Sequence, residues 1–267
     1  MNLRRVFALM LRQFYLLRGS PTRLLPLFAW VAIDIVLWGF ITRYLNAITQ
    51  SGMNFVPALL GAVLLWDFLT RVMQGVTMAF FEDVWSRNFL NLFATPMQFP
   101  EYMVGLVLTG ITTSFFGLVV MAALASSVFG LSFFVYGVTI VPCLLILFLS
   151  GIALGLFGSA IVLRLGPAAE WLIWPIPAIL SPFAGVFYPL STLPTWMRGI
   201  SYLLPPSYAF EGLRSAVTGT AAPGFVLLGA VCLAAAYVVV AGLVFWRVYR
   251  YTVRTGLVAR YSAETVS

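Results

Sequence analysis

The stretch YMVGLVLTGITTSFFGLVVMAALASSVFGLSFFVYGVTIVPCLLILFLSGIALGLFGSA, residues 102–160, indicates the fold class, because it contains no Asp, Glu, Lys or Arg. A membrane-spanning helix needs about 20 apolar residues to cross a hydrocarbon core of about 30 Å, so this stretch is long enough for two passes. Gly130-Leu131-Ser132 is the place for the turn between them, since glycine tolerates tight backbone conformations. The sequence therefore predicts two transmembrane helices, Tyr102–Phe129 and Phe133–Ala160.

Four more apolar windows extend this pattern to six spans: Leu24–Tyr44, Phe55–Phe81, Ala169–Phe187 and Phe225–Trp246. Of the 267 residues, 62% are hydrophobic and 9% charged, whereas soluble domains carry roughly 25% charged residues. Three prolines in the fifth window are expected to kink its helix. We predict an all-α membrane protein with six transmembrane helices in a single domain over residues 1–267, with both ends of the chain on one side of the membrane.

The arginines orient the chain, because cytoplasmic loops of membrane proteins are enriched in positive charge. All 15 basic residues are arginine. Only three lie on one side of the predicted spans: Arg43, Arg198 and Arg214. Eleven lie on the other side, which we expect to be cytoplasmic: Arg4, Arg5, Arg12, Arg18, Arg23, Arg87, Arg164, Arg247, Arg250, Arg254 and Arg260. The net charge of +7 is therefore read as a topology signal, and no nucleic-acid-binding module is expected.

The missing residue types exclude several chemistries. The chain has no lysine and no histidine. A phosphate-binding loop of the Walker A type needs lysine, and neither a histidine-based triad nor a histidine metal site is possible. Cys143 and Cys232 lie in apolar runs, where cysteine behaves as a small hydrophobic residue. We expect no catalytic residue, no metal site and no ATP hydrolysis by this chain.

Residues 1–23 have the pattern of an amphipathic helix in the membrane interface. Their apolar residues recur at helical spacing from Leu3 to Leu17, while Arg5, Arg12 and Gln13 fall away from that stripe. Gly19-Ser20-Pro21 is expected to end the helix. The alternative is a simple basic anchor with no further role.

The loop between the second and third spans mixes charge with aromatic residues. Trp85, Phe89, Leu92 and Phe93 are spaced for one face of a short helix, and Thr95-Pro96 is expected to end it. Such a helix lies on lipid or docks in a groove of a partner protein.

The segment of residues 188–220 is too apolar for a solvated loop and too rich in proline for a span. Two short helices fit it, about Pro194–Leu204 and about Pro206–Val217, as re-entrant helices on the outer side. Glu211 and Arg214 are three residues apart and are expected to pair. After the sixth span, residues 247–267 form a cytoplasmic tail.

Charged residues also occur inside the predicted spans. Asp67 and Arg71 are four residues apart in the second span, and Asp34 lies midway along the first. Each such charge costs at least about 2.5–3.5 kcal/mol on insertion scales, so it needs a partner or a water-lined cavity. Two interpretations remain open: a structural pair that joins the first two helices, and the lining of a translocation path. The aromatic residues of the fifth span likewise belong either to interfacial belts or to a pathway.

Three groups of residues resemble the membrane subunit of a bacterial ABC-2 type exporter over roughly residues 1–250. The interfacial N-terminal helix resembles the connecting helix of that family. Asn91–Met97, followed by Glu101 and Gly105, resembles its first coupling-helix region, although 87–91 depart from the glycine-threonine and acidic pattern of many relatives. The most specific part is Ser181–Pro189 with Leu193-Pro194, Leu204–Tyr208 and Gly212–Arg214.

This resemblance implies a division of labour. A separate ATPase subunit in two copies would bind ATP and Mg, and two copies of this chain would form a homodimer in the bacterial inner membrane, in contact with membrane lipid. The substrate would be hydrophobic or amphipathic: a drug, a lipid or a lipid-linked polysaccharide. The ATPase-coupling residues would be Trp85, Arg87, Phe89, Leu92 and Phe93. The translocation pathway would include Asp34, Trp174, Phe183 and Phe187. The outer gate would comprise Tyr188, Trp196, Tyr202, Tyr208, Glu211 and Arg214.

Two other classes of function stay open. An intramembrane lipid-modifying enzyme would use Asp34, Asp67 or Glu211 as its acids, and an ion-coupled carrier would use Asp34 and Asp67. An enzyme is disfavoured because no convergent cluster of catalytic acids is present in the sequence. A carrier would move its substrate with a proton gradient and without nucleotide.

Overall fold

The computed structural model describes residues 2–19, 21–48, 56–86, 89–220 and 223–257, and every element in these ranges is helical. The ten α-helices of the described ranges are α1 (Leu3–Arg18), α2 (Pro21–Ile48), α3 (Gly61–Trp85), α4 (Phe89–Ala94), α5 (Phe99–Phe129), α6 (Ile140–Leu165), α7 (Ile176–Ala184), α8 (Thr195–Ser201), α9 (Pro205–Val217) and α10 (Gly224–Arg254). A π-helical turn, η1 (Val56–Leu60), precedes α3. Three 3₁₀ segments lie between the helices of the described ranges: η2 (Phe133–Thr139), η3 (Pro167–Leu172) and η4 (Leu190–Thr192).

The predicted long spans are confirmed as apolar helices in four places. Val56–Trp85, Phe99–Phe129, Phe133–Leu165 and Gly224–Arg254 are each long and apolar enough to cross a membrane. The turn predicted at Gly130-Leu131-Ser132 separates α5 from η2, and Gly130 adopts a left-handed conformation (φ 70°) that ends α5. The predicted first span lies within α2, which runs over 28 residues.

The predicted fifth span, Ala169–Phe187, is not one kinked helix. It consists of η3 and the nine-residue α7, with a turn between them. Its prolines remove backbone donors that a continuous helix would need, and Gly185 (φ 61°) ends α7 in the left-handed region. Phe187 therefore lies outside any helix, in the segment that leads to α8.

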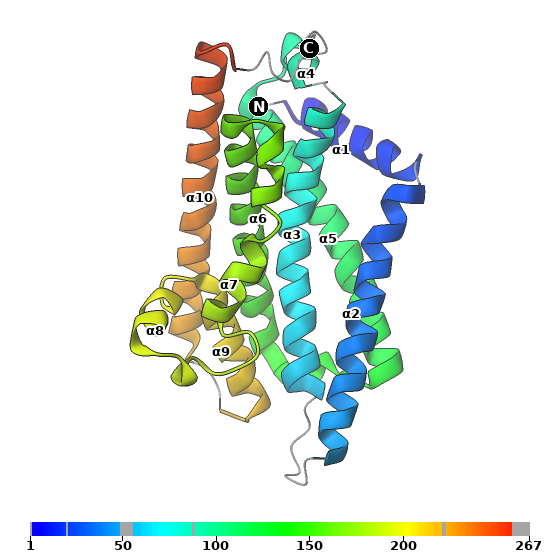
Figure 1. Cartoon of the computed structure of the whole chain (residues 1–267), viewed down its shortest axis with the longest axis vertical. Coiled ribbons are helices and arrows are strands. Elements are labelled where there is room, and N and C mark those ends of the chain that lie inside the picture. Colours follow the sequence, from blue (N-terminus) through cyan, green and yellow to red (C-terminus); the bar gives the residue numbers. More distant parts are fainter. Residues whose placement is uncertain (1, 20, 49–55, 87–88, 221–222, 258–267) are drawn as a thin grey trace.

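The two ends of the bundle carry different elements (Figure 1). The helix α1, the short α4 and the C-terminal end of α10 lie together at one end, and α8 and α9 lie at the opposite end. The helix α1 and the C-terminal end of α10 therefore share one end of the bundle, and the side of the membrane on which they lie stays a prediction. The two short helices predicted after the fifth span are α8 and α9, close to their expected positions.

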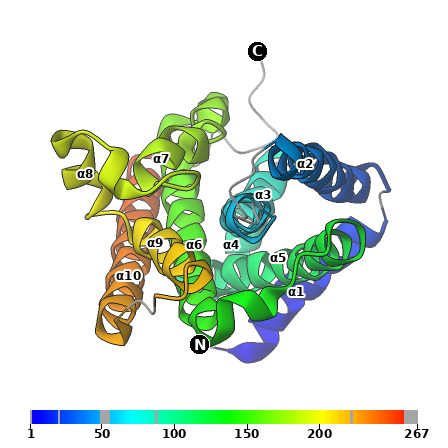
Figure 2. The same ribbon diagram turned by 90° about the horizontal axis from the view of Figure 1, so that it is seen from below.

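The helix α3 is the centre of the bundle, and in the end-on view of Figure 2 it lies among α2, α5 and α6. Small residues let its neighbours approach closely. A Cβ atom at Gly151 of α6 would lie 2.7 Å from Leu69 O, and one at Gly155 would lie 2.9 Å from Met73 O. On the α5 side, a Cβ atom at Gly110 would lie 2.7 Å from Val76 Cγ2. Backbone contacts of this kind leave no room for a larger side chain.

The helix α2 stands at the edge of the bundle and is held mainly against α5 and η1. The ring of Phe129 lies directly over Gly39, where a Cβ atom would be 2.2 Å from its Cζ. Arg43 donates a hydrogen bond to Val128 O (2.8 Å) and lies over the Phe129 ring. These contacts hold the C-terminal half of α2 against the end of α5.

Candidate functional site

A buried carboxylate joins α1 to the turn between α4 and α5. Glu101 accepts hydrogen bonds from the backbone N–H groups of Asn2 (2.6 Å) and Gln98 (3.1 Å). Arg5 forms an ion pair with it (Nη1 to Oε2, 3.3 Å) and also donates to Pro96 O. Glu101 is thus tied to α1 and to the start of its own helix, and Arg5 also ties α1 to the turn that follows α4.

A second buried carboxylate, Asp83 near the end of α3, holds the middle of α1. Arg12 forms an ion pair with Asp83, and Tyr102 of α5 donates a hydrogen bond to Asp83 Oδ2 (2.8 Å). One turn earlier on α3, Ala79 O accepts a hydrogen bond from Gln13 Nε2 (3.2 Å). Three helices therefore meet at Asp83.

These contacts show which face of α1 packs on the bundle. The helix is amphipathic as expected, and Arg5, Arg12 and Gln13, which fall away from the apolar stripe, bind groups of α3, of α5 and of the turn before α5. The reason is that buried carboxylates are costly unless they are paired. The apolar stripe is divided between a buried pair, Val6 and Leu9, and a row of exposed residues: Leu3, Phe7, Leu11 and Phe14.

The substitution Tyr102→Phe tests the Asp83 junction, because it removes one hydroxyl group and keeps the buried ring. We expect the free energy of unfolding to fall by about 1–3 kcal/mol, since Asp83 loses a charge-assisted hydrogen bond. Thermal unfolding of the purified chain in detergent measures the change. The control is Tyr251→Phe, an exposed tyrosine on α10, and an equal response of both variants would contradict the assignment.

The predicted coupling residues are divided among different elements. Trp85 belongs to the end of α3 rather than to the short helix, and its Nε1–H donates to Glu170 Oε2 of η3 (2.9 Å). Leu92 of α4 is buried. Arg87 lies outside the described residues, as do the side chains of Phe89 and Phe93, although both belong to α4. Thr95-Pro96 follows the helix end as predicted.

The hydrogen bond between Trp85 and Glu170 joins the end of α3 to η3. Glu170 was not among the residues singled out from the sequence. Its position next to Trp171, as an acidic residue in an otherwise apolar window, could have indicated a polar contact. This hydrogen bond connects α3 with the start of the predicted fifth span.

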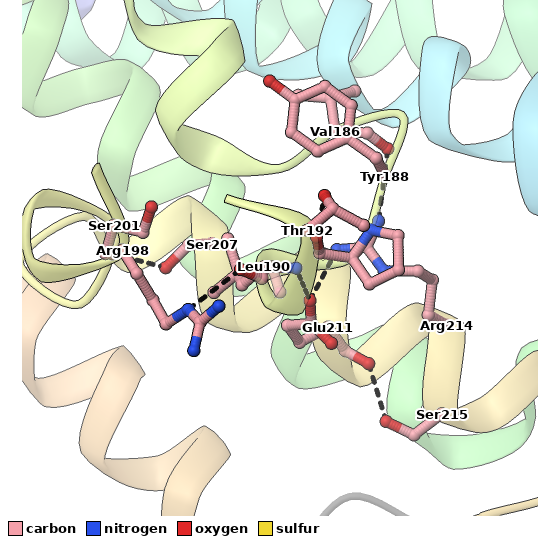
Figure 3. A network of polar contacts seen from close by, with 12 residues as sticks. Val186, Tyr188, Leu190, Thr192, Arg198, Ser201, Ser207, Glu211, Arg214 and Ser215 are labelled. Atoms are coloured by element: carbon pink, nitrogen blue, oxygen red, sulfur yellow. Dashed lines mark hydrogen bonds and ion pairs between the residues drawn. The ribbon is translucent and has the colours of Figure 1, made fainter. Parts of the chain in front are cut away.

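At the opposite end, a polar network fixes the chain that leads from α7 to α8 (Figure 3). Glu211 Oε1 accepts hydrogen bonds from Leu190 N (2.7 Å) and from Arg214 Nη2 (3.0 Å), which confirms the predicted pair. Arg214 also donates to Val186 O (3.4 Å). The two charged side chains of α9 thus hold residues 186–190 in place.

Arg198 of α8 secures the same segment and was missed as a site residue. Its guanidinium donates to the carbonyl oxygens of Leu190 (3.1 Å), Ser191 (2.7 Å) and Leu193 (3.0 Å). Two tyrosines of the predicted gate also bind backbone: Tyr188 to Pro182 O and Tyr208 to Tyr202 O. The predicted gate residues Trp196 and Tyr202 are exposed.

The predicted pathway residues are only partly brought together. Phe187 stacks on Trp38 of α2, with ring centroids 5.3 Å apart and planes at 12°. Phe183 contacts Trp196 edge to face, at 6.5 Å. Trp174 is exposed on the turn before α7. Trp38 was missed, although it lies four residues from Asp34 on the same face of α2.

The intramembrane charges lie between α2 and α3. Asp34 and Asp67 both interact electrostatically with Arg71 and with each other. Gly117 of α5 leaves room for the arginine, since a Cβ atom there would lie 3.2 Å from Arg71 Cδ. Asp67 Oδ2 is buried and has no hydrogen-bond partner among the described residues.

The comparisons with known proteins agree with the resemblance. A family model described as ABC-2 type transporter matches residues 4–218. No curated protein matches the chain. Across the described ranges, no group of three or more His, Cys, Asp or Glu residues is placed to hold a metal ion.

Proposed function

The chain belongs to the ABC-2 type transporter family, and from this premise we propose that it is the membrane subunit of an ATP-driven exporter whose ATPase is a separate polypeptide. Membership makes it a multi-pass transporter permease. The proposal adds the direction of transport, a hydrophobic or amphipathic substrate, and an arrangement of two permeases with two ATPases that bind ATP and Mg. The observation that carries it is the end of the bundle where α1 and α4 lie together (Figure 1) and where Trp85 binds Glu170 of η3.

The charges at the two ends support the orientation. The end of the bundle that carries α4 also carries α1 and the C-terminal ends of α6 and α10 (Figure 1). These segments contain eight arginines whose side chains are described: Arg4, Arg5, Arg12, Arg18, Arg164, Arg247, Arg250 and Arg254. The opposite end carries Arg43, Arg198 and Arg214. The positive-inside rule then places α4 in the cytoplasm, where an ATPase can reach it.

The contacts of α1 suggest how force from the ATPase reaches the membrane. In this proposal, the ATPase seats α4 and the end of α3 in a groove and moves them when it closes on ATP. Glu101 and Asp83 pass the movement to α1, which precedes α2 in the chain. The helix α2 carries Asp34 and Trp38, beside the path that we assign to the interface between two permeases.

The outer gate in this proposal is the segment from Tyr188 to Val217. Its rigidity comes from Arg198, Glu211 and Arg214, and its contact with α2 is the stack of Phe187 on Trp38. Separation of that stack would open the path outward. The exposed apolar face of α2, with Ile33, Leu37 and Phe40, would face the second copy of the chain.

ATPase measurements test the proposal. The purified chain alone is expected to show no ATP hydrolysis, since it lacks the lysine of a phosphate-binding loop. Hydrolysis is expected to appear when the chain is co-purified with its partner and reconstituted in vesicles, together with ATP-dependent movement of substrate. Robust hydrolysis by the isolated chain, or substrate movement driven by a proton gradient without nucleotide, would overturn the proposal.

A further inference from the structure

One cluster inside the bundle has more negative than positive charge. It contains the carboxylates of Asp34 and Asp67 and the guanidinium of Arg71, and all three groups interact. Asp34 lies midway along α2, and Asp67 lies eleven residues after Val56, roughly 16 Å along its helix. Charges at this depth are expensive unless each has a counter-charge. Arg71 can neutralise one carboxylate, so the other is compensated either by a proton or by a second positive group.

One oxygen of the Asp67 side chain, Oδ2, is buried and lacks a hydrogen-bond partner among the described residues. Buried polar atoms are normally satisfied, so an exception calls for a missing partner.

An aromatic surface borders the same cluster. Trp38 lies one helical turn from Asp34 on the same face of α2, and Phe187 stacks on it from the segment after α7. Both Asp34 and Trp38 are only partly buried, and Phe187 is exposed. Aromatic faces attract cations, and apolar walls with few polar groups are typical of sites for small organic molecules.

The geometry points to a binding site for a hydrophobic organic cation, with Asp34 and Asp67 as counter-charges and Trp38 with Phe187 as its aromatic wall. This inference rests on the proposed function, because it names the class of substrate for the exporter. A molecule with a delocalised positive charge and apolar substituents fits the site. Its positive charge would be the counter-charge of the Asp67 carboxylate, and its apolar groups would contact Trp38 and Phe187.

Equilibrium binding to the full chain in phosphatidylcholine nanodiscs tests this inference without any ATPase. The probes are tetraphenylphosphonium and the neutral triphenylphosphine oxide, which shares the aryl groups. We expect saturable binding of the cation to the wild type and weaker binding of the neutral probe. Asp67→Asn and Asp34→Asn are each expected to weaken cation binding about tenfold or more, because a charged contact is lost.

The controls separate this role from a structural one. Glu82→Gln removes a negative charge from the same helix about 22 Å away and is expected to leave binding unchanged. Asp67→Asn is expected to keep or raise the melting temperature, since it removes an uncompensated buried carboxylate. A lower melting temperature with unchanged cation binding would instead identify a structural pair.

The inference is overturned if the wild type does not bind the cation, or if both Asp variants bind it as the wild type does. Equal binding of the neutral probe would also overturn it. These results leave the proposed function intact wherever the chain still activates a partner ATPase. Conversely, cation binding that depends on Asp67, in a chain that activates no ATPase, would keep the site and reject the exporter.

Discussion

The double substitution Gly151→Ala/Gly155→Ala is expected to destabilise the bundle more than any other change of similar size. Both glycines lie on α6 and face the backbone of the central helix α3. A Cβ atom at Gly151 would lie 2.6 Å from Val72 Cβ and 2.7 Å from Leu69 O, and at Gly155 a Cβ atom would lie 2.7 Å from Val76 Cβ. Real Cβ atoms do not approach backbone this closely, so α6 must move away from α3.

The expected loss follows from overpacking. Inserting a methyl group into a well-packed interior costs about 1–3 kcal/mol at each site, so the pair costs roughly 2–6 kcal/mol if the two effects add. Thermal unfolding of the purified chain and the yield of monodisperse protein in detergent measure it. Because α6 also packs against α10 and α9, the separation would spread through the bundle.

The matched control is Gly242→Ala on α10. This glycine is also inside a long helix, but a Cβ atom there would meet nothing within 4 Å. The same change in helix propensity, about 0.5–1 kcal/mol in favour of alanine, then acts without a clash. We expect an unchanged or higher melting temperature for this variant. An equal melting temperature for the double variant and the control would contradict the close packing of α6 on α3.

The second large effect is expected at α4, where Phe89→Glu together with Phe93→Glu should abolish co-purification of the ATPase. The two residues are four apart on a short helix at the exposed end of the bundle. Aromatic residues at the centre of an interface each cost about 2 kcal/mol or more when lost, and a carboxylate in an apolar groove adds a desolvation cost. Affinity purification of the tagged chain, followed by quantification of the ATPase, measures the result.

One further variant makes this test specific. Trp196→Glu places the same charge on an exposed aromatic residue of α8, at the opposite end of the bundle, and is expected to retain the ATPase. Leu92 is unsuitable for the test because it is buried, so a charge there would disturb folding. Normal recovery of the ATPase with the Phe89 and Phe93 double variant, in a chain with an unchanged melting temperature, would remove α4 from the docking surface.

The sequence carried enough information for the elements whose signals are local. Residues 102–160 predicted two apolar helices with a turn at 130–132, and the structure has α5 before that turn and η2 followed by α6 after it. The prolines and glycines around residues 190–217 likewise predicted α8 and α9. The length of an apolar run and the positions of proline and glycine determine local backbone structure within a few residues. The sequence is therefore sufficient to predict these helices and turns.

The predicted fifth span, Ala169–Phe187, shows where the effect of the prolines was predicted wrongly. Three prolines in an apolar window were interpreted as a kink in one helix, whereas the chain forms η3, a turn and α7. Whether a proline-rich segment bends or breaks also depends on where tertiary contacts hold the chain on either side of it. Just after α7, Arg198 and Arg214 donate hydrogen bonds to backbone carbonyl groups, and Glu211 accepts one from Leu190 N.

From its amino-acid order alone, the chain is recognisable as a helical membrane protein without its own phosphate-binding loop, because composition and apolar length need no partner. The roles of its charges depended on tertiary structure. The sequence places Arg5 and Arg12 off the apolar stripe of α1 but names no partner for them, because Glu101 and Asp83 are distant in sequence. Folding of α1 onto α3 and α5 brings these groups together, because buried carboxylates require a counter-charge wherever in the chain it occurs.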